Sequence, residues 1–269
     1  MGDPMPPRSN STVRMELDDS THIATVILQR PEAMNAISRQ LAMELREVCN
    51  DIRANAEIRV VILAGAGDRA FSAGADLRER RGLSAAERTE HTLLIEAAVE
   101  DVAALPMPTI AAVRGYALAG GAELAIACDI RAVSDDASLG FPEVKVGIFP
   151  GAGGVLRLPR LVSDGTAREL LFTGRTVTAA EALQIGLVDH VVPGDQVYST
   201  ARSLAGSIAA NAPLALRAIK RALNRNFGQP HDTAREITRQ LRMALDVTDD
   251  YEEGLQAFAE RRQPVFTGR

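Results

Sequence analysis

The stretch from Ala111 to Asp129 constrains the fold more than any other part of the chain. It begins as an apolar run, passes through paired glycines at Gly120 and Gly121, and continues with apolar residues at helical spacing. We therefore predict a strand, a glycine-rich turn and a buried helix, in that order. Glu123 falls in the first turn of this helix, beside unpaired N–H groups and the positive end of the helix dipole. Such a segment is suited to stabilising an anion while moving a proton.

The same segment also allows a purely structural interpretation. Glycines permit close packing of a helix on a strand, and a carboxylate near a helix N-terminus complements the helix dipole. The segment alone leaves both interpretations open, so the rest of the chain has to decide between them.

Composition excludes several classes of protein. The chain has 269 residues, 46% of them hydrophobic and 24% charged, with a net charge of −5. These values are typical of a globular protein and give no general case for nucleic acid or an anionic membrane as partner. No apolar run is long enough to span a bilayer, and the pattern of a signal peptide is missing. We expect a cytoplasmic protein in which Cys49 and Cys128 are reduced core residues.

Alternating strand and helix patterns predict an α/β fold. Residues 1–12 are expected to be disordered, 13–200 to form the core and 201–269 to form a helical C-terminal region. Ser38 and Ser84 are predicted N-caps of helices over 39–54 and 85–104. The first of these helices has a predicted apolar side of Leu41, Met43, Leu45, Val48 and Ile52. Strands are expected at 13–17, 22–28, 59–64, 130–133 and 138–141, and from Thr166 onward the chain is expected to be almost entirely helical.

Three turns are rich in small residues and carry the residues with catalytic potential. They comprise residues 73–76, residues 119–123, and residues 141–143 with 150–154. Two of the turns offer N–H donors at helix starts, and two supply carboxylates, Glu123 and Glu143. Paired carboxylates beside an oxyanion hole can add and remove protons next to a carbonyl.

Other catalytic and binding motifs are missing or weak. The sequence has no P-loop, no Gly-x-Ser-x-Gly motif and no histidines at metal-ligand spacing, so we expect no metal site. Residues 65–70 match a loose dinucleotide-binding fingerprint, but Phe71-Ser72-Ala73-Gly74 follow where a helix should begin. The polar segment 78–83 is predicted to be a surface loop.

Several motifs in the same order resemble those of the crotonase superfamily, the enoyl-CoA hydratases and isomerases. The resemblance runs from about residue 13 to the C-terminus. It implies a crotonase-like spiral of ββα units with a helical C-terminal region that drives formation of a homotrimer, and pairs of trimers form hexamers. The matching stretches are 28–36, 70–77, 115–123 with Cys128-Asp129, 141–154 and 253–266.

The resemblance also implies an active site for acyl-CoA thioesters. The backbone N–H groups of Ala75 and Gly120 would hold the thioester carbonyl, and that of Gly151 would help to hold a water. Glu123 is assigned as the general base for water and Glu143 as the acid toward Cα. Isomerases of this superfamily usually manage with one glutamate, so the presence of both favours a hydratase that acts on a trans-2-enoyl-CoA.

By the same resemblance, no separate cofactor is expected, because coenzyme A is part of the substrate. Each arginine among the predicted CoA contacts also allows the interpretation of a solvated surface charge. Two of the contacts, on the C-terminal segment, would serve the CoA of a neighbouring subunit. The predicted CoA-binding residues are Arg30, Ala73, Asp76, Leu77 and Arg78, with Phe258 and Arg261 from the neighbour.

One departure and three alternatives stand beside this hypothesis. Ala119 occupies a position where many hydratases have a third glycine. The chain is alternatively an isomerase or another acyl-CoA enzyme of the same fold, or a catalytically silent homologue. Residues 167–175 also resemble a methylglutaconyl-CoA hydratase branch with some RNA-binding members. For that branch, a basic face is expected from Lys220, Arg221, Arg225 and Arg239.

Overall fold

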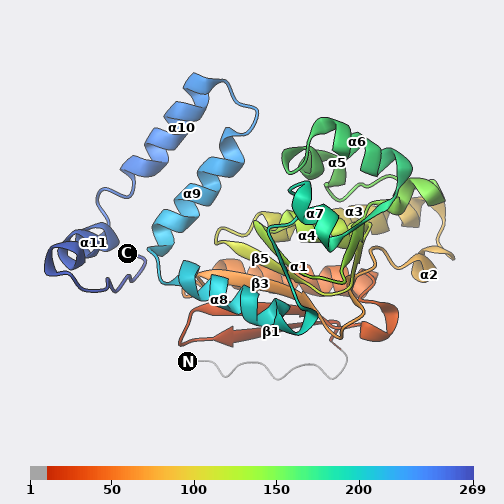
Figure 1. Cartoon of the computed structure of the whole chain (residues 1–269), viewed down its shortest axis with the longest axis horizontal. Coiled ribbons are helices and arrows are strands. Elements are labelled where there is room, and N and C mark those ends of the chain that lie inside the picture. Colours follow the sequence, from red (N-terminus) through yellow and green to blue (C-terminus); the bar gives the residue numbers. More distant parts are fainter. Residues whose placement is uncertain (1–10) are drawn as a thin grey trace.

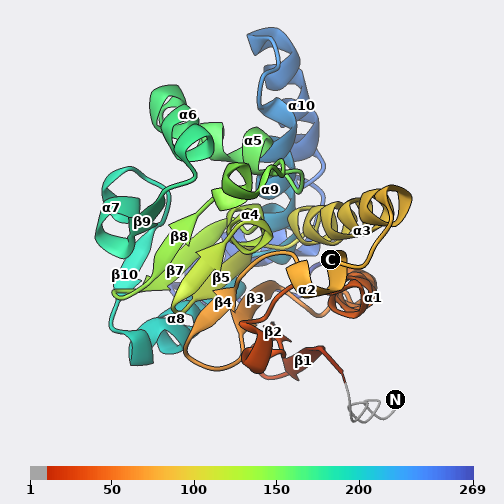
Figure 2. The ribbon, with the colours of Figure 1, turned by 90° about the vertical axis from the view of Figure 1, so that its right-hand side faces the viewer.

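Two β-sheets and the helices that cover them form the body of the molecule (Figures 1 and 2). The computed structural model describes residues 11–269, so the first ten residues of the segment expected to be disordered lie outside the described part. Ser11 and Thr12 lead into the first strand, where the Thr12 N–H donates to Glu44 Oε2 at 2.6 Å.

The larger sheet has six strands in the order β1-β2-β3-β5-β7-β10. The first two strands are antiparallel, and every other pair in this sheet is parallel. Parallel neighbours need a crossover between them, which the helices provide. The strands are β1 (Val13–Asp18), β2 (Ile23–Leu28), β3 (Val60–Gly65), β5 (Thr109–Val113), β7 (Ile130–Ser134) and β10 (His190–Val192).

The smaller sheet shows that the chain is a spiral. Its strands are β4 (Ala70–Ser72), β6 (Tyr116–Leu118), β8 (Ser138–Gly140) and β9 (Thr176–Thr178), in that order. The chain passes from β3 to β4, from β5 to β6 and from β7 to β8, so each turn of the spiral adds one strand to each sheet before a helix follows. The predicted spiral of ββα units is thereby confirmed.

The helices fall into groups by position along the spiral. Helices α1 (Arg39–Ala54) and α3 (Ala85–Ala103) pack on each other, and α4 (Gly120–Ala127) packs on α3. Short helices follow the smaller sheet's strands. These are α2 (Leu77–Arg80), η2 (Pro142–Val146), α5 (Gly154–Arg157), η3 (Leu158–Arg160), α6 (Asp164–Thr173) and α7 (Ala179–Gln184), with η1 (Pro31–Ala33) and η4 (Gly194–Gln196) elsewhere.

The hydrophobic core lies on both faces of the larger sheet. The main cluster includes buried residues of α1, α3 and α4 together with strand residues. A second cluster lies under α8 (Val197–Ala209), whose Ala201 and Ala205 pack against strand residues such as Ile62 and Ile110. The boundary expected at residue 200 therefore falls inside a helix that covers the sheet.

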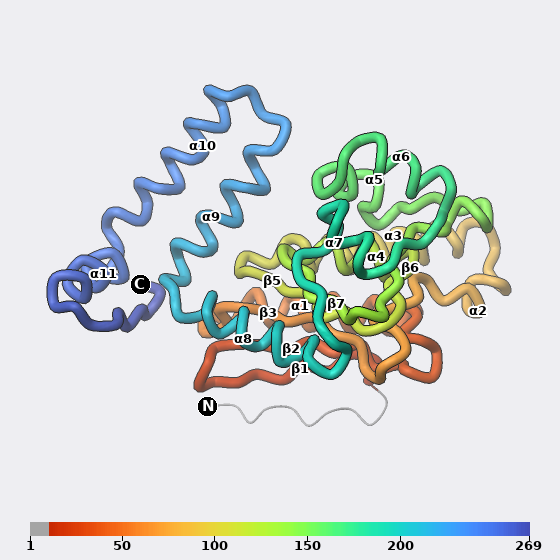
Figure 3. Tube along the Cα trace, in the orientation of Figure 1, coloured from red at the N-terminus to blue at the C-terminus, as the bar shows by residue number. Residues whose placement is uncertain are grey.

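Three further helices project from this body (Figures 1 and 3). They are α9 (Pro213–Asn226), α10 (His231–Met243) and α11 (Asp249–Glu260), and α9 packs along α10. Large apolar side chains on these helices are exposed, among them Ile219, Leu223, Leu255 and Phe258. In the described residues, no helix is both long enough and apolar enough to cross a membrane.

Most of the long predicted elements are confirmed, and two expectations are wrong. Ser38 and Ser84 cap α1 and α3 as predicted, the second with a complete capping box. Met43 is exposed rather than part of the apolar side of α1, while Ala42 is buried there. The region after residue 166 also contains the strands β9 and β10. Each has only three residues, which exist as strands because β8 and β7 supply their hydrogen-bonding partners.

The turn before α4 has an unusual backbone. Ala119, the N-cap residue, has φ 51° and ψ −128°, a conformation that is unfavourable for any residue with a Cβ. The structure thus places strain at the one position of this turn where the sequence has alanine instead of the expected glycine.

We predict that Ala119→Gly stabilises the protein by about 1 kcal/mol. Release of backbone strain contributes roughly 1–3 kcal/mol, and the greater freedom of glycine in the unfolded chain offsets part of it. Urea unfolding at fixed protein concentration measures the change. Ala125→Gly, inside α4, is the matched control and should lower stability by roughly 1–2 kcal/mol, because helix propensity and a buried methyl group are both lost. Equal destabilisation by both substitutions would show that Ala119 is not strained.

Candidate active site

A cavity of about 350 Å³ lies where the three small-residue turns meet. One wall comes from the turn before α2 and from α3, and another comes from the start of α4. The rest of the lining includes η2 and the segment between η2 and α5. Most lining side chains are apolar, and both candidate glutamates lie in the lining. The lining residues include Ala73, Ala75, Leu77, Arg80, Thr92, Ile95, Gly120, Glu123, Glu143, Phe149 and Gly151.

Two of these turns touch each other through their backbones. A Cβ built on Gly74 would lie 2.9 Å from the Gly120 nitrogen, and Gly74 has φ +86°. A Cβ on Gly120 would lie 3.7 Å from the Ala75 nitrogen. Only glycine fits at position 74, so the close approach of the turns depends on it.

The N–H groups of Ala75 and Gly120 are available as donors at this contact. Gly120 begins α4, and the first N–H groups of a helix have no intrahelical partner. On either side of Ala75, the Gly74 N–H donates to Ser72 Oγ and the Asp76 N–H donates to Ile37 O. In residues 11–269, no group accepts a hydrogen bond from the Ala75 N–H itself. The sequence-predicted oxyanion donors therefore lie side by side in the cavity lining.

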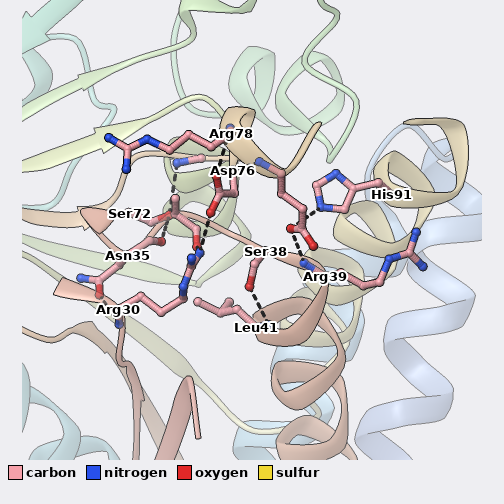
Figure 4. Close-up of polar contacts among 12 residues, drawn as sticks. Arg30, Asn35, Ser38, Arg39, Leu41, Ser72, Asp76, Arg78 and His91 are labelled. Atoms are coloured by element: carbon pink, nitrogen blue, oxygen red, sulfur yellow. Dashed lines mark hydrogen bonds and ion pairs between the residues drawn. The ribbon is translucent and has the colours of Figure 1, made fainter. Parts of the chain in front are cut away.

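An ion pair holds the first of these turns in place (Figure 4). Arg30 Nη1 lies 3.0 Å from Asp76 Oδ2 and also donates to the Ala36 carbonyl. Asp76 caps α2 by accepting from the N–H groups of Arg78 and Glu79. Burial raises the pKa of Asp76, but the hydrogen bonds from Arg30 and these N–H groups outweigh burial, so its net pKa is lowered. Asp76 is an N-cap anion and not a first-turn residue of α2.

Further contacts fix the backbone on either side of that ion pair (Figure 4). Ser72 Oγ donates to Asn35 O at 2.8 Å, and Asn35 Nδ2 donates to Ala70 O. Glu79 accepts from the Arg39 N–H at 2.9 Å and lies 3.4 Å from His91 Nε2. The turn that carries Ala75 is therefore tied to α1 and α3.

Glu123 is a buried carboxylate with backbone donors. It is 3% exposed, and its Oε1 accepts from the Gly154 N–H at 2.8 Å. Burial, and to a smaller extent the nearby charge of Glu143, raise its pKa, while the N–H groups of Gly154 and Ala152 work against the shift. The net result is a pKa of about 7. Glu123 can accordingly exchange a proton near neutral pH.

Glu143 is buried without such donors. It lies in η2, is 6% exposed, and no other residue in the described chain donates a hydrogen bond to either carboxylate oxygen. Burial raises its pKa. Because Glu123 has the backbone donors and Glu143 lacks them, a single negative charge shared by the two is better stabilised on Glu123. Such a pair has the chemistry to provide one base and one acid in the same cavity.

The predicted CoA contacts fall into three groups. Ala73 and Leu77 line the cavity beside Ala75. Arg30 and Asp76 are paired with each other, whereas Arg78 is exposed and its guanidinium extends away from them (Figure 4). Phe258 and Arg261 lie at the end of α11 and are both exposed, outside the cavity. Their contact with the CoA of a neighbouring subunit stays a prediction.

Sequence reasoning missed the wall that α2 and α3 provide. Arg80 falls in the segment expected to be a surface loop, yet it lines the cavity together with Thr92, Ile95 and Phe149. These residues meet only through the packing of α3 against the segment before α5. Only the closeness of Arg80 in sequence to the turn at Ala75 could have indicated that Arg80 lines the cavity.

Two other expectations concern metals and nucleic acid. Among residues 11–269, no group of three or more acidic, histidine or cysteine residues gathers in a way that could hold a metal ion. Lys220 does not belong to a basic face, because it is buried, lies 2.7 Å from Asp129 and donates to Met107 O. The other members of the expected face, Arg221, Arg225 and Arg239, are exposed.

The raised pKa of Glu123 predicts a dependence of stability on pH. Between pH 4.5 and about 7 the folded protein keeps a proton that the unfolded chain has lost, so stability falls as pH rises. The unfolding free energy of wild type should drop by up to about 3 kcal/mol relative to Glu123→Gln over this range. Urea unfolding at several pH values checks this, with exposed Glu32→Gln as control. If the difference in unfolding free energy between wild type and Glu123→Gln stays the same at every pH, the prediction is contradicted.

Comparisons with known proteins agree with the fold and show the family. A family model described as Enoyl-CoA hydratase/isomerase matches residues 18–269. The chain is 39% identical to the Short-chain-enoyl-CoA hydratase of Clostridium acetobutylicum, over 92% of this chain and 95% of that protein. It is 41% identical to Enoyl-CoA isomerase/hydratase fer4 of Mycosarcoma maydis, over 95% and 97%. The crystal structure of enoyl-CoA hydratase from Bacillus anthracis, 40% identical, matches with a TM-score of 0.93 over 96% of this chain and 100% of that one. The chain belongs to the enoyl-CoA hydratase/isomerase family.

Proposed function

We propose that the protein is an enoyl-CoA hydratase that adds water across the 2,3 double bond of a trans-2-enoyl-CoA to give a 3-hydroxyacyl-CoA. The observation that carries the proposal is the pair of buried glutamates in one cavity, one with backbone donors and one without. Hydration needs a base that removes a proton from water and an acid that donates a proton to carbon. The different environments of Glu123 and Glu143 suit these two roles.

The proposed reaction uses both backbone donors and both carboxylates. The thioester oxygen is bound by the N–H groups of Ala75 and Gly120, which stabilise the negative charge of the enolate-like transition state. Glu123 removes a proton from water as the oxygen attacks Cβ, and Glu143 delivers its proton to Cα. Water thus supplies the hydroxyl group, and the proton gained by Glu123 balances the one lost by Glu143. The Gly151 N–H is assigned to holding the water.

Coenzyme A enters only as part of the substrate, and we propose no separate cofactor. We further propose a homotrimer or a hexamer formed by two trimers. Exposed apolar side chains on α9, α10 and α11, such as Leu223 and Phe258, support an assembly through the projecting helices. The cytoplasmic location stays a prediction.

An assay of crotonyl-CoA hydration tests the proposal. The reaction is followed through the loss of absorbance of the conjugated enone. Glu123→Gln and Glu143→Gln should each lower kcat by about 10²–10⁴-fold, since each removes a proton-transfer group. Glu32→Gln, an exposed substitution of the same kind, should leave kcat unchanged. Full turnover by either site variant would remove that residue from the mechanism. Chromatography that shows double-bond migration without a 3-hydroxy product would instead identify an isomerase.

A further inference from the structure

A second cavity lies on the outer face of the larger sheet, where α8 covers it. We call it the strand-end cavity, because its lining comes from the carboxyl ends of β2, β3 and β5, together with β1 and the start of α8. Its volume is about 430 Å³, and within the described chain it shares no lining residue with the candidate active site. Ligands of α/β folds commonly bind outside the carboxyl ends of parallel strands. The proposed hydratase function makes no use of this cavity.

Arg114 brings an unpaired positive charge to the strand-end cavity. It follows directly after β5, is partly buried and lines the cavity. Within residues 11–269, its guanidinium forms no ion pair and donates no hydrogen bond. The other charged residues of the lining, Arg14 and Glu16, pair with each other at 2.7 Å. One positive charge is therefore left without a partner, and a bound anion would relieve the cost of its partial burial.

The start of α8 lies beside this charge. A Cβ built on Gly194, in η4 directly before α8, would lie 3.9 Å from Arg114 Nη2. Val197 and Tyr198, the first residues of α8, line the cavity. The N-cap residue Gln196 makes no capping hydrogen bond with its side chain, so the helix start keeps its capacity to bind an acceptor. The positive end of the helix dipole and the guanidinium both favour an anion at this place.

The turn after β3 opens its backbone to the same cavity. Residues 65–67 are Gly-Ala-Gly, and all three line the cavity. They begin the loose dinucleotide-binding fingerprint of the sequence, an arrangement in which a glycine-rich turn and a helix start hold phosphate together. Here the chain continues into β4 and not into a helix, but α8 provides a helix start at the same edge of the sheet. The two parts of that arrangement meet in space although they are remote in sequence.

The remaining lining suits the organic part of a ligand. Ile27, Ala64 and Ala112 offer apolar surface. Tyr198 adds an aromatic ring that is held in place, because its hydroxyl lies 3.1 Å from Thr25 Oγ1. A flat aromatic ring packs favourably on a surface of this kind. The cavity thus combines an anion-binding end with an apolar and aromatic wall.

We propose that the strand-end cavity binds a phosphate monoester of an aromatic or heterocyclic compound, with a nucleoside monophosphate as the simplest example. Arg114 and the start of α8 hold the phosphate, and the apolar wall with Tyr198 holds the ring. The proposal does not depend on the hydratase function. Inorganic phosphate and the nucleotide part of CoA share some of this chemistry, so the experiment separates these sources.

Titration calorimetry with AMP, adenosine and inorganic phosphate tests the proposal. Wild type should bind AMP at least about tenfold more tightly than either of the other probes, since AMP alone carries both ring and phosphate. Arg114→Gln should weaken AMP binding about 10- to 100-fold, because a charge-assisted hydrogen bond is lost. Arg114→Lys should restore part of the affinity. Arg225→Gln removes an exposed positive charge on α9 and should leave the affinity for AMP unchanged.

Contrary results of the titrations bear on separate parts of the proposal. No binding of AMP by wild type, or equal binding of AMP and adenosine, would show that the cavity does not recognise phosphate. Equal binding of AMP and inorganic phosphate would show that it does not recognise the ring. Unchanged AMP binding in Arg114→Gln would place the nucleotide elsewhere. Each of these results would overturn the proposal.

Two further measurements distinguish the strand-end cavity from the candidate active site and from a structural role of Arg114. AMP should bind wild type equally well with and without saturating butyryl-CoA, whereas competition would assign AMP to the CoA site and overturn the proposal. Arg114→Gln should keep the urea unfolding midpoint of wild type, because its guanidinium makes no hydrogen bond or ion pair within residues 11–269. A clearly lower midpoint together with weaker AMP binding would assign the loss to the fold and refute the site.

Discussion

The close approach of two backbone turns, at Gly74 and Gly120, is the constraint on which the site depends. The two turns could not lie this close together if position 74 had a side chain. Their contact brings the Ala75 N–H from one turn of the spiral beside the first N–H of α4 from the next. The spiral is what makes this possible, because it stacks β4 and β6 as neighbours in the smaller sheet.

The two glutamates show how one cavity can hold two carboxyl groups in different states. Both are buried, which favours the neutral form, but within residues 11–269 the N–H groups of other residues donate only to Glu123. Those donors come from the segment that begins α5, so the difference between the two carboxyl groups is fixed by the backbone and does not depend on a mobile side chain. This supports the assignment of Glu123 as base and Glu143 as acid.

Features with local causes could be predicted from the sequence, whereas features that depend on distant partners could not. Ser38 and Ser84 identified helix starts because a cap acts within a few residues. The order of motifs likewise identified the family and some residues of the cavity, among them Ala75, Glu123 and Glu143. The strands β9 and β10 were missed because their pairing partners are remote in sequence, and Arg80 was missed because α3 and the segment before α5 make it part of the cavity.

The late position of α8 in the chain has a consequence for folding during synthesis. The outer face of the larger sheet carries Ile23, Val60 and Ile62, which all come from the first quarter of the sequence, yet α8 ends only at Ala209. A growing chain must therefore leave the ribosome almost completely before this apolar face is covered. Until then the nascent sheet is exposed to association with other chains, and it presents the kind of surface that chaperones recognise.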